Sequence, residues 1–231
     1  MTEPISAAAA PAEEADILDP FEVRVLAVLA EKEALTPDNY PLSLNALTNG
    51  CNQLSSRDPV MSISEQTVQE VLQRLLQRKF IAEVRQAGAR VPKYEHRMRM
   101  KWALEQDKLA ILTLLMLRGI QTAGEVRNRS GRLHEFASVA EVETGLQFLI
   151  DKFPPLVARL ARAPGTKEAR YAHLLSGTET LERQETAASF SSEPETRRAD
   201  RITQLEEEVA RLRVEVAALG EQFASFKRQF D

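Results

Sequence analysis

Residues 62–98 read SISEQTVQEVLQRLLQRKFIAEVRQAGARVPKYEHRM, and this stretch decides the fold class that we expect. Ser62 and Glu65 have the spacing of a capping box, which predicts a helix running to about Arg78. Apolar residues recur along it at helical period: Val68, Val71, Leu72, Leu75 and Leu76. The stretches 80–86 and 91–98 lie on either side of Gly88 and are typical of two strands, so they predict a β-hairpin.

Two more helices are expected before this stretch. Asp19 and Pro20 supply a start signal for a helix over 20–33. A second helix is expected over 42–52, after the turn residues of 36–41. Three helices followed by a hairpin is the winged-helix arrangement, a helix-turn-helix variant. Its third helix enters the major groove of DNA, and its hairpin, the wing, contacts the backbone or the minor groove.

The same order of elements occurs twice in the chain. Val68, Leu72 and Leu75 match Val142, Leu146 and Leu149 at a constant offset of 74. The string Lys93-Tyr94-Glu95-His96 matches Arg170-Tyr171-Ala172-His173. Helices are expected at 107–117, 122–129 and 139–152, the last behind a Ser138–Glu141 capping box, and strands at 156–162 and 169–174. We therefore predict a mainly α fold with small β-hairpins, as tandem winged-helix domains over 18–103 and 104–177.

The two ends of the chain differ from this body. Residues 1–17 are rich in Ala, Pro and Glu and predict a disordered, acidic N-terminus, and 178–199 have the composition of a flexible linker. Residues 200–231 carry a heptad seam that predicts a coiled-coil helix: Ile202, Leu205, Val209, Leu212, Val216, Leu219, Phe223 and Phe226. β-Branched residues at a and Leu at d favour a parallel homodimer. The alternative is an amphipathic helix packed on its own domain.

Charge and composition limit the function classes. The net charge is −4, but residues 21–177 carry +5 between two acidic ends, which is compatible with binding a polyanion. No apolar run approaches the ~18 residues of a membrane span. A single cysteine excludes an internal disulfide framework and, without a secretory signal, favours the reducing cytoplasm.

Catalysis finds little support in the sequence. The three histidines, His96, His134 and His173, fall in different elements and lack metal-ligand spacing. Cys51 is interpreted as a small buried residue. No glycine-rich phosphate loop is present. We expect no enzymatic activity, no cofactor and no metal.

Several polar residues are candidates for nucleic-acid contact. Glutamine can bond adenine in the major groove, and arginine can grip phosphates bidentately. The candidates are Gln66, Gln69, Gln73 and Arg74 on the third helix, Arg90, Lys93 and Arg97 on the first wing, and Arg127 and Arg129 in the second copy. The alternatives are a solvated polar face and ordinary ion pairs. The third helix of the second copy carries Glu141 and Glu143 and is a poor face for DNA.

The tyrosine and histidine of each wing also allow two interpretations. Tyr94 and His96 fall on one side of their strand, as do Tyr171 and His173. They form either a stacking surface or packed residues that anchor the wing to its domain.

A family resemblance rests on several uncommon strings. They include Glu31-Lys32-Glu33-x-x-Thr36-Pro37-x-x-Tyr40-Pro41-Leu42-Ser43-Leu44-Asn45 and Leu117-Arg118-Gly119-x-Gln121-Thr122-x-Gly124-Glu125. Over about 18–177 the chain resembles the YceH family of bacterial proteins. The resemblance implies a tandem winged-helix architecture in a family whose biochemical role is not established.

Together these features predict a non-enzymatic, DNA-associated protein, for example a transcriptional regulator. Its expected partners are double-stranded DNA and a second copy of the chain. The alternative is a protein–protein scaffold whose winged helices dock protein partners without binding DNA.

Overall fold

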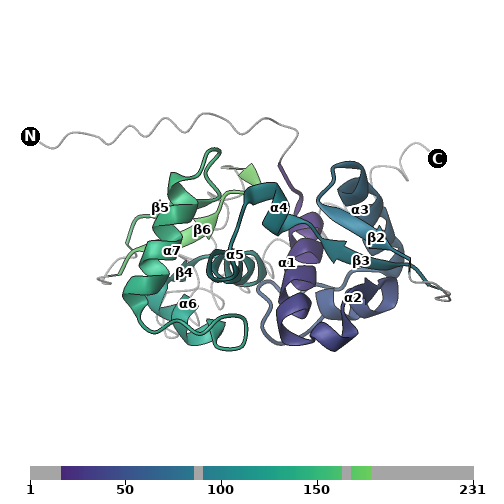
Figure 1. The fold of residues 1–231 in the computed structure, drawn as a ribbon, viewed down its shortest axis with the longest axis horizontal. Coiled ribbons are helices and arrows are strands. Elements are labelled where there is room, and N and C mark those ends of the chain that lie inside the picture. The colour runs from purple at the N-terminus through teal and green to yellow at the C-terminus, as the bar shows by residue number, and fades with distance from the viewer. Residues whose placement is uncertain (1–16, 86–90, 163–167, 178–231) are drawn as a thin grey trace, which may run out of the picture. The chain divides into compact units, whose positions relative to one another are not determined.

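The computed structural model describes residues 17–85, 91–162 and 168–177, and these form a mainly helical fold with two small antiparallel sheets (Figure 1). They all belong to one compact unit. Three predicted segments lie outside the described residues: the N-terminal segment apart from Ile17, the linker and the coiled-coil seam. The wing candidate Arg90 also lies outside them.

The first repeat consists of α1 (Pro20–Leu35), a 3-10 turn η2 (Pro37–Asn39), β1 (Leu42–Ser43), α2 (Leu44–Cys51), α3 (Glu65–Gln77), β2 (Ile81–Val84) and β3 (Lys93–His96). A short helix α4 (Met98–Trp102) leads into the second repeat. That repeat consists of α5 (Gln106–Arg118), β4 (Gln121–Thr122), α6 (Ala123–Ser130), α7 (Val139–Asp151), β5 (Val157–Leu160) and β6 (Arg170–His173). The strand orders, β1-β3-β2 and β4-β6-β5, are equivalent.

The predicted helices and hairpin strands are confirmed to within a few residues, but two details differ. The strands β1 and β4 each add a third strand to a sheet, and two residues are too short to show a period. The capping box predicted at Ser62 is wrong. The α3 N-cap is Ser64, whose hydroxyl accepts a hydrogen bond from the Thr67 N–H at 3.1 Å. Ile63, between the two serines, is buried in the core, so the helix starts after it.

The start of α1 is fixed by a reciprocal cap. The Asp19 carboxylate accepts from the backbone N–H of Phe21 and Glu22, both at 2.8 Å, and the Glu22 carboxylate accepts from the Asp19 N–H at 3.0 Å. Pro20 occupies the first turn, where its missing N–H costs no hydrogen bond. The start signal predicted at Asp19 and Pro20 is therefore confirmed.

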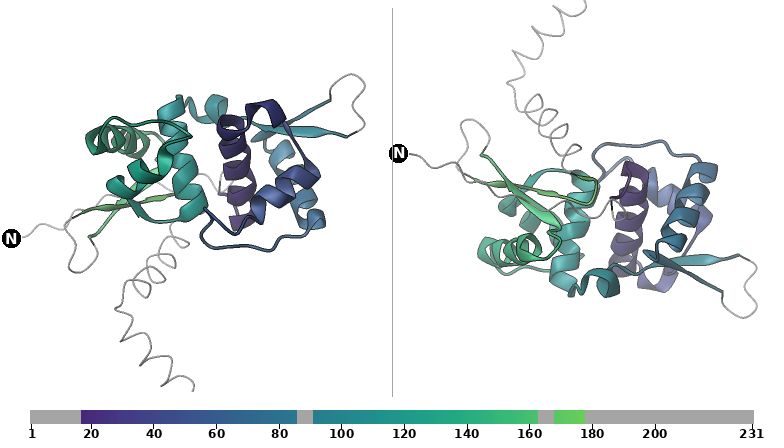
Figure 2. Two further views of the ribbon diagram at one scale, coloured as in Figure 1. Left: turned by 90° about the horizontal axis from the view of Figure 1, so that it is seen from below. Right: turned by 90° about the horizontal axis from the view of Figure 1, so that it is seen from above.

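The core runs through both repeats without interruption. Residues 22–31 of α1 and 109–117 of α5 are buried on all sides of their helices, as expected for helices enclosed by other elements. These two equivalent helices pack against each other, and each sheet lies on the outer side of its own helix (Figures 1 and 2). Backbone hydrogen bonds also join the repeats: Asp58 N–H to the Leu117 carbonyl, and Leu18 N–H to the Leu175 carbonyl.

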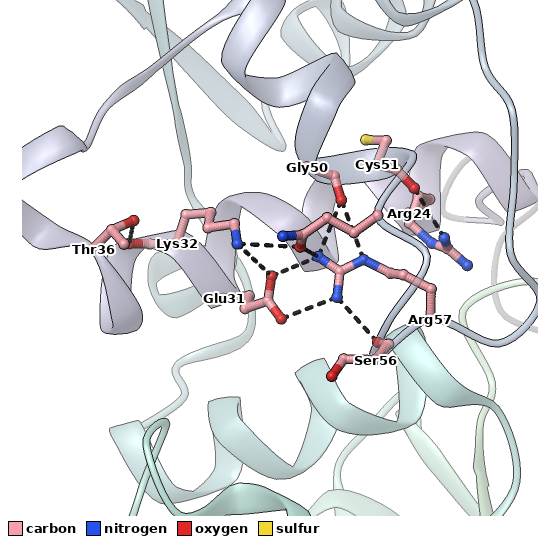
Figure 3. A network of polar contacts seen from close by, with 9 residues as sticks. Arg24, Glu31, Lys32, Thr36, Gly50, Cys51, Ser56 and Arg57 are labelled. Atoms are coloured by element: carbon pink, nitrogen blue, oxygen red, sulfur yellow. Dashed lines mark hydrogen bonds and ion pairs between the residues drawn. The ribbon is translucent and has the colours of Figure 1, made fainter.

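A buried ionic network holds the loop between α2 and α3 (Figure 3). The fully buried Arg57 side chain donates to both oxygens of the Glu31 carboxylate, at 3.0 and 2.6 Å. It also donates to the Gly50 carbonyl and to the Gln53 side chain. Arg24 reaches the same loop through the carbonyls of Cys51 and Pro59. The network fixes the loop whose Asp58 N–H bonds the end of α5.

We predict that Arg57→Met lowers the free energy of unfolding by about 3 kcal/mol, the lower end of the range for a broken buried pair, because it removes the bidentate partner of the buried Glu31 carboxylate and leaves it only Lys32. Denaturant unfolding at neutral pH measures this loss. The double variant Glu31→Leu/Arg57→Met should regain most of the stability, since apolar side chains can replace a buried ion pair. A double variant that is less stable than Arg57→Met would contradict this account.

Candidate nucleic-acid interface

The glutamines of α3 share one exposed face of the helix. Gln66, Gln69 and Gln73 are all exposed, whereas Val68, Leu72 and Leu75 on the other side are buried. The Gln66 amide donates to the Glu70 carboxylate at 3.3 Å. The Gln69 and Gln73 side chains form no hydrogen bond within the described part of the chain, so they are available to an external partner.

Arg74 lies at the edge of this face and is already paired. Its guanidinium donates to Asp19 at 2.6 Å and to Glu22 at 3.2 Å. Arg78 donates to Glu22 at 2.9 Å and to the Ile17 carbonyl at 2.8 Å. The two arginines hold the end of α3 against the start of α1. Sequence reasoning missed these pairs, because nothing local links residues more than fifty positions apart.

The hairpin of the first repeat keeps cations unpaired. Lys93 is half-buried on β3, opposite Ser43 of β1, and Arg97 is exposed just after the strand. Neither side chain forms a hydrogen bond or ion pair with any residue that the structure describes. These two are therefore the described wing candidates with a free positive charge.

The arginines predicted in the second repeat serve their own domain. Arg127 donates to the backbone carbonyls of Phe136 and Ala137, which fixes the loop after α6. Arg129 donates to Gln121 at 2.8 Å and to Glu125 at 3.1 Å. In this structure both arginines bind groups of their own domain, which was the alternative to phosphate binding.

The exposed face of α7 differs in chemistry from that of α3. At the offset of 74, Gln66, Gln69 and Arg74 correspond to Ala140, Glu143 and Phe148, whereas Gln73 corresponds to another exposed amide, Gln147. Phe148 is 42% exposed and Phe153, just beyond the helix, is 90% exposed. The ammonium groups of Lys108 and Lys152 lie 5.3 and 5.1 Å from the centroid of the Phe148 ring. The second repeat thus keeps one of the three amides and replaces the other two and Arg74 with small, acidic and aromatic side chains.

The tyrosine and histidine of each wing pack inward. Tyr94, His96, Tyr171 and His173 are all buried, which favours the anchoring interpretation over a stacking surface. The His96 ring contacts the Glu33 carboxylate at 3.1 Å, and this hydrogen bond is the main reason that the pKa of Glu33 is lowered. His173 lacks such a partner: its Nδ1 atom is buried with no hydrogen bond to any described residue.

The described residues offer little for catalysis or metal binding. Burial raises the pKa of the Cys51 thiol to about 12, so it remains protonated and unreactive at neutral pH. No three His, Cys, Asp or Glu side chains are grouped to hold a metal ion in residues 17–85, 91–162 and 168–177. No helix within these ranges combines the length and apolar character needed to cross a bilayer.

We predict that His173 makes the fold sensitive to acid. Burial lowers the pKa of His173 to about 4, against an ordinary value of 6.5. The pKa of His173 is lower in the folded chain than in the unfolded chain, so the neutral imidazole costs the fold no stability above about pH 6.5. As the pH falls toward 4, the free energy of unfolding decreases by roughly 3 kcal/mol.

The measurement compares denaturant unfolding at pH 7 and pH 4.5 for the unmodified chain and for His173→Leu. The carboxylates titrate in both proteins, so the difference between them isolates the histidine. An equal loss of stability in both proteins would contradict the prediction.

Comparison with known proteins places the chain in a family. Residues 18–166 match the family described as "Protein of unknown function, DUF480". The chain is 70% identical to the UPF0502 protein HEAR1280 of Herminiimonas arsenicoxydans over 216 residues, which cover 93% of this chain and 91% of that protein. It is 52% identical to the UPF0502 protein azo0627 of Azoarcus sp. (strain BH72) over 214 residues, covering 93% and 94%. The chain therefore belongs to the DUF480 family, which agrees with the expectation of a bacterial family whose biochemical role is not established.

Proposed function

We propose that the chain is a non-enzymatic, DNA-associated protein of the cytoplasm that acts as a transcriptional regulator through two tandem winged-helix domains, 18–103 and 104–177. The order of helix, short strand, helix, helix and hairpin in each repeat supports the winged-helix assignment. The observation that carries the proposal is the exposed glutamine face of α3 in the same domain as a hairpin with unpaired Lys93 and Arg97.

In this proposal α3 enters the major groove. The amides of Gln69 and Gln73 can each donate to N7 and accept from N6 of adenine, which reads sequence directly. Lys93 and Arg97 neutralise backbone phosphates and set the register of the domain on the duplex. Because residues 21–177 carry a net charge of only +5, we expect weak binding with a strong dependence on salt.

The second repeat favours a different partner. Phe148 and Phe153 are both exposed apolar side chains, and α7 also carries the exposed Glu143, whose carboxylate would repel a phosphate backbone. Exposed apolar patches of this kind mark protein-binding sites. This observation supports a second candidate function, a scaffold that docks proteins, and we assign that role to α7 within the same molecule.

The heptad seam of residues 200–231 completes the proposal as a homodimerisation segment. Arg201 at g would face Glu206 at e of a parallel partner, and Glu208 would face Arg213, so both flanking pairs are attractive. A dimer presents two first wings to one duplex and doubles the number of phosphate contacts.

Replacing Lys93 and Arg97 with alanine should flatten the dependence of DNA affinity on salt. Each lost phosphate contact reduces the slope of log K against log salt by about 0.9. The measurement is fluorescence anisotropy with a random duplex, starting at ~50 mM salt, where binding is strongest. The double variant Arg159→Ala/Arg162→Ala removes the same charge from exposed positions of the second hairpin and should leave the slope unchanged. Absence of binding by the unmodified chain at the lowest salt would favour the scaffold function.

Leu212→Asp should convert the dimer into a monomer. It places a carboxylate in the apolar seam without a partner, at a cost of several kcal/mol if it stays charged. Sedimentation at micromolar concentration measures the mass, and the circular dichroism of the body serves as the folding control. A monomeric unmodified chain would instead assign the seam to docking within the chain or on another partner.

A further inference from the structure

A cavity of about 410 Å³ opens beside Lys93, which forms with Val84 the last strand pair before the connection of the first hairpin. Two of the residues that line it are bases and none is an acid; the full set is Lys32, Thr36, Asn39, Pro41, Leu42, Ser43, Ala46 and Lys93. The Asn39 amide and the Ser43 hydroxyl supply further hydrogen-bond donors, whereas the Thr36 hydroxyl already donates to the Lys32 carbonyl at 3.2 Å. The lining therefore has the chemistry of a site for an anion.

The fold brings these groups close together. Ser43 and Lys93 are directly opposite each other in the β1–β3 pairing. The Lys32 side chain is only 19% exposed, and its ammonium group is held by Glu31 at 3.3 Å and Gln53 at 3.2 Å. Lys93 has no partner within the described part of the chain. Lys32 is thus a fixed wall of the cavity, and Lys93 supplies the uncompensated charge.

The second repeat holds a carboxylate at the equivalent position. There, Thr122 pairs with Arg170 as Ser43 pairs with Lys93. The Glu125 carboxylate accepts from the Thr122 N–H at 2.9 Å and from Arg129 at 3.1 Å. Three residues after the N-cap, where the second repeat has Glu125, the first repeat has Ala46, which lines the cavity. The second repeat therefore has its own carboxylate, Glu125, at this position. The first repeat has no carboxylate there, and its Lys93 is unpaired within the described part of the chain.

We propose that the cavity of the first repeat binds a phosphate group, held by Lys93, by the Asn39 amide of η2 and by the Ser43 hydroxyl of β1. A phosphate of the DNA backbone and the phosphate of a small phosphorylated compound present the same chemistry. The DNA source rests on the proposed function, because Lys93 belongs to the hairpin that this function assigns to the duplex. The small-compound source does not depend on that function.

The test titrates the full-length, isotope-labelled chain with inorganic phosphate, with sodium chloride adjusted to keep the ionic strength constant. We expect saturable NMR shifts at the backbone amides of Ser43, Ala46 and Lys93. Ala46→Glu, which introduces the carboxylate that Glu125 supplies in the second repeat, should weaken phosphate binding by about tenfold or more through like-charge repulsion. This variant should remain folded, because the new carboxylate completes a capping box with Ser43. Asn128→Glu makes the same charge change on exposed α6 and should bind phosphate normally.

Duplex DNA separates the two sources. If Ala46→Glu weakens DNA binding more than Asn128→Glu does, the cavity holds a backbone phosphate. If phosphate binds but DNA affinity is the same in both variants, or DNA does not bind at all, the site serves a small phosphorylated compound. A failure of the chain to bind DNA also counts against the proposed function. If phosphate causes no saturable shift and Ala46→Glu leaves DNA affinity at the level of Asn128→Glu, the phosphate site is wrong whether or not the chain binds DNA.

Discussion

The packing of α1 against α5 is the contact on which the rest of the structure depends. In α1, five consecutive residues from Val25 to Leu29 are fully buried, and in α5 the run from Leu109 to Leu117 is buried in the same way. A helix that is apolar on every side cannot be covered by the elements of one small repeat. Each repeat therefore completes the other's core, and burial of each large apolar side chain is worth about 1.5–3 kcal/mol.

This shared core determines how the two exposed helices are used. Since α1 and α5 pack as one core and backbone bonds tie Asp58 to Leu117 and Leu18 to Leu175, α3 and α7 are attached to a common rigid base. A ligand held by α3 then fixes the orientation of the surface around Phe148. In our proposal this is how the duplication is exploited: the buried positions of the two repeats stay equivalent, while exposed positions such as Gln69 and Arg74 are replaced by Glu143 and Phe148.

The sequence predicts those parts of the fold that are periodic. The stripe from Val68 to Leu76 and its counterpart at Val142 locate α3 and α7 because one face of each is buried. The strands β1 and β4 are invisible to such reasoning, since their two residues are defined only by pairing with β3 and β6. The α4 helix was not predicted either, because its five residues are too few for a helical period.

The candidate site was harder to predict than the fold, because several of its arginines pair with carboxylates of the same chain. The glutamine face follows directly from the helical period. The pairing of Arg129 with Glu125 could also have been predicted, because the two are four residues apart on one helix. The pairing of Arg74 with Asp19 and Glu22 could not, because it joins segments that only the folded chain brings together.

These pairings change how the arginines of the chain are interpreted. Counting arginines suggests a strongly basic surface, yet Arg57, Arg74, Arg78, Arg99 and Arg129 each contact a carboxylate within the fold. An arginine that must leave a carboxylate to reach a phosphate exchanges one ion pair for another, so it adds little net binding energy. At a distance, a polyanion responds to the net charge, which is only +5 over residues 21–177. In our proposal, a single body with so small a net charge binds DNA weakly at physiological salt. In our proposal, joining two bodies through the heptad seam makes the second contact intramolecular and raises the avidity without any new charge. The DNA-associated function that we propose therefore requires the dimer that we propose.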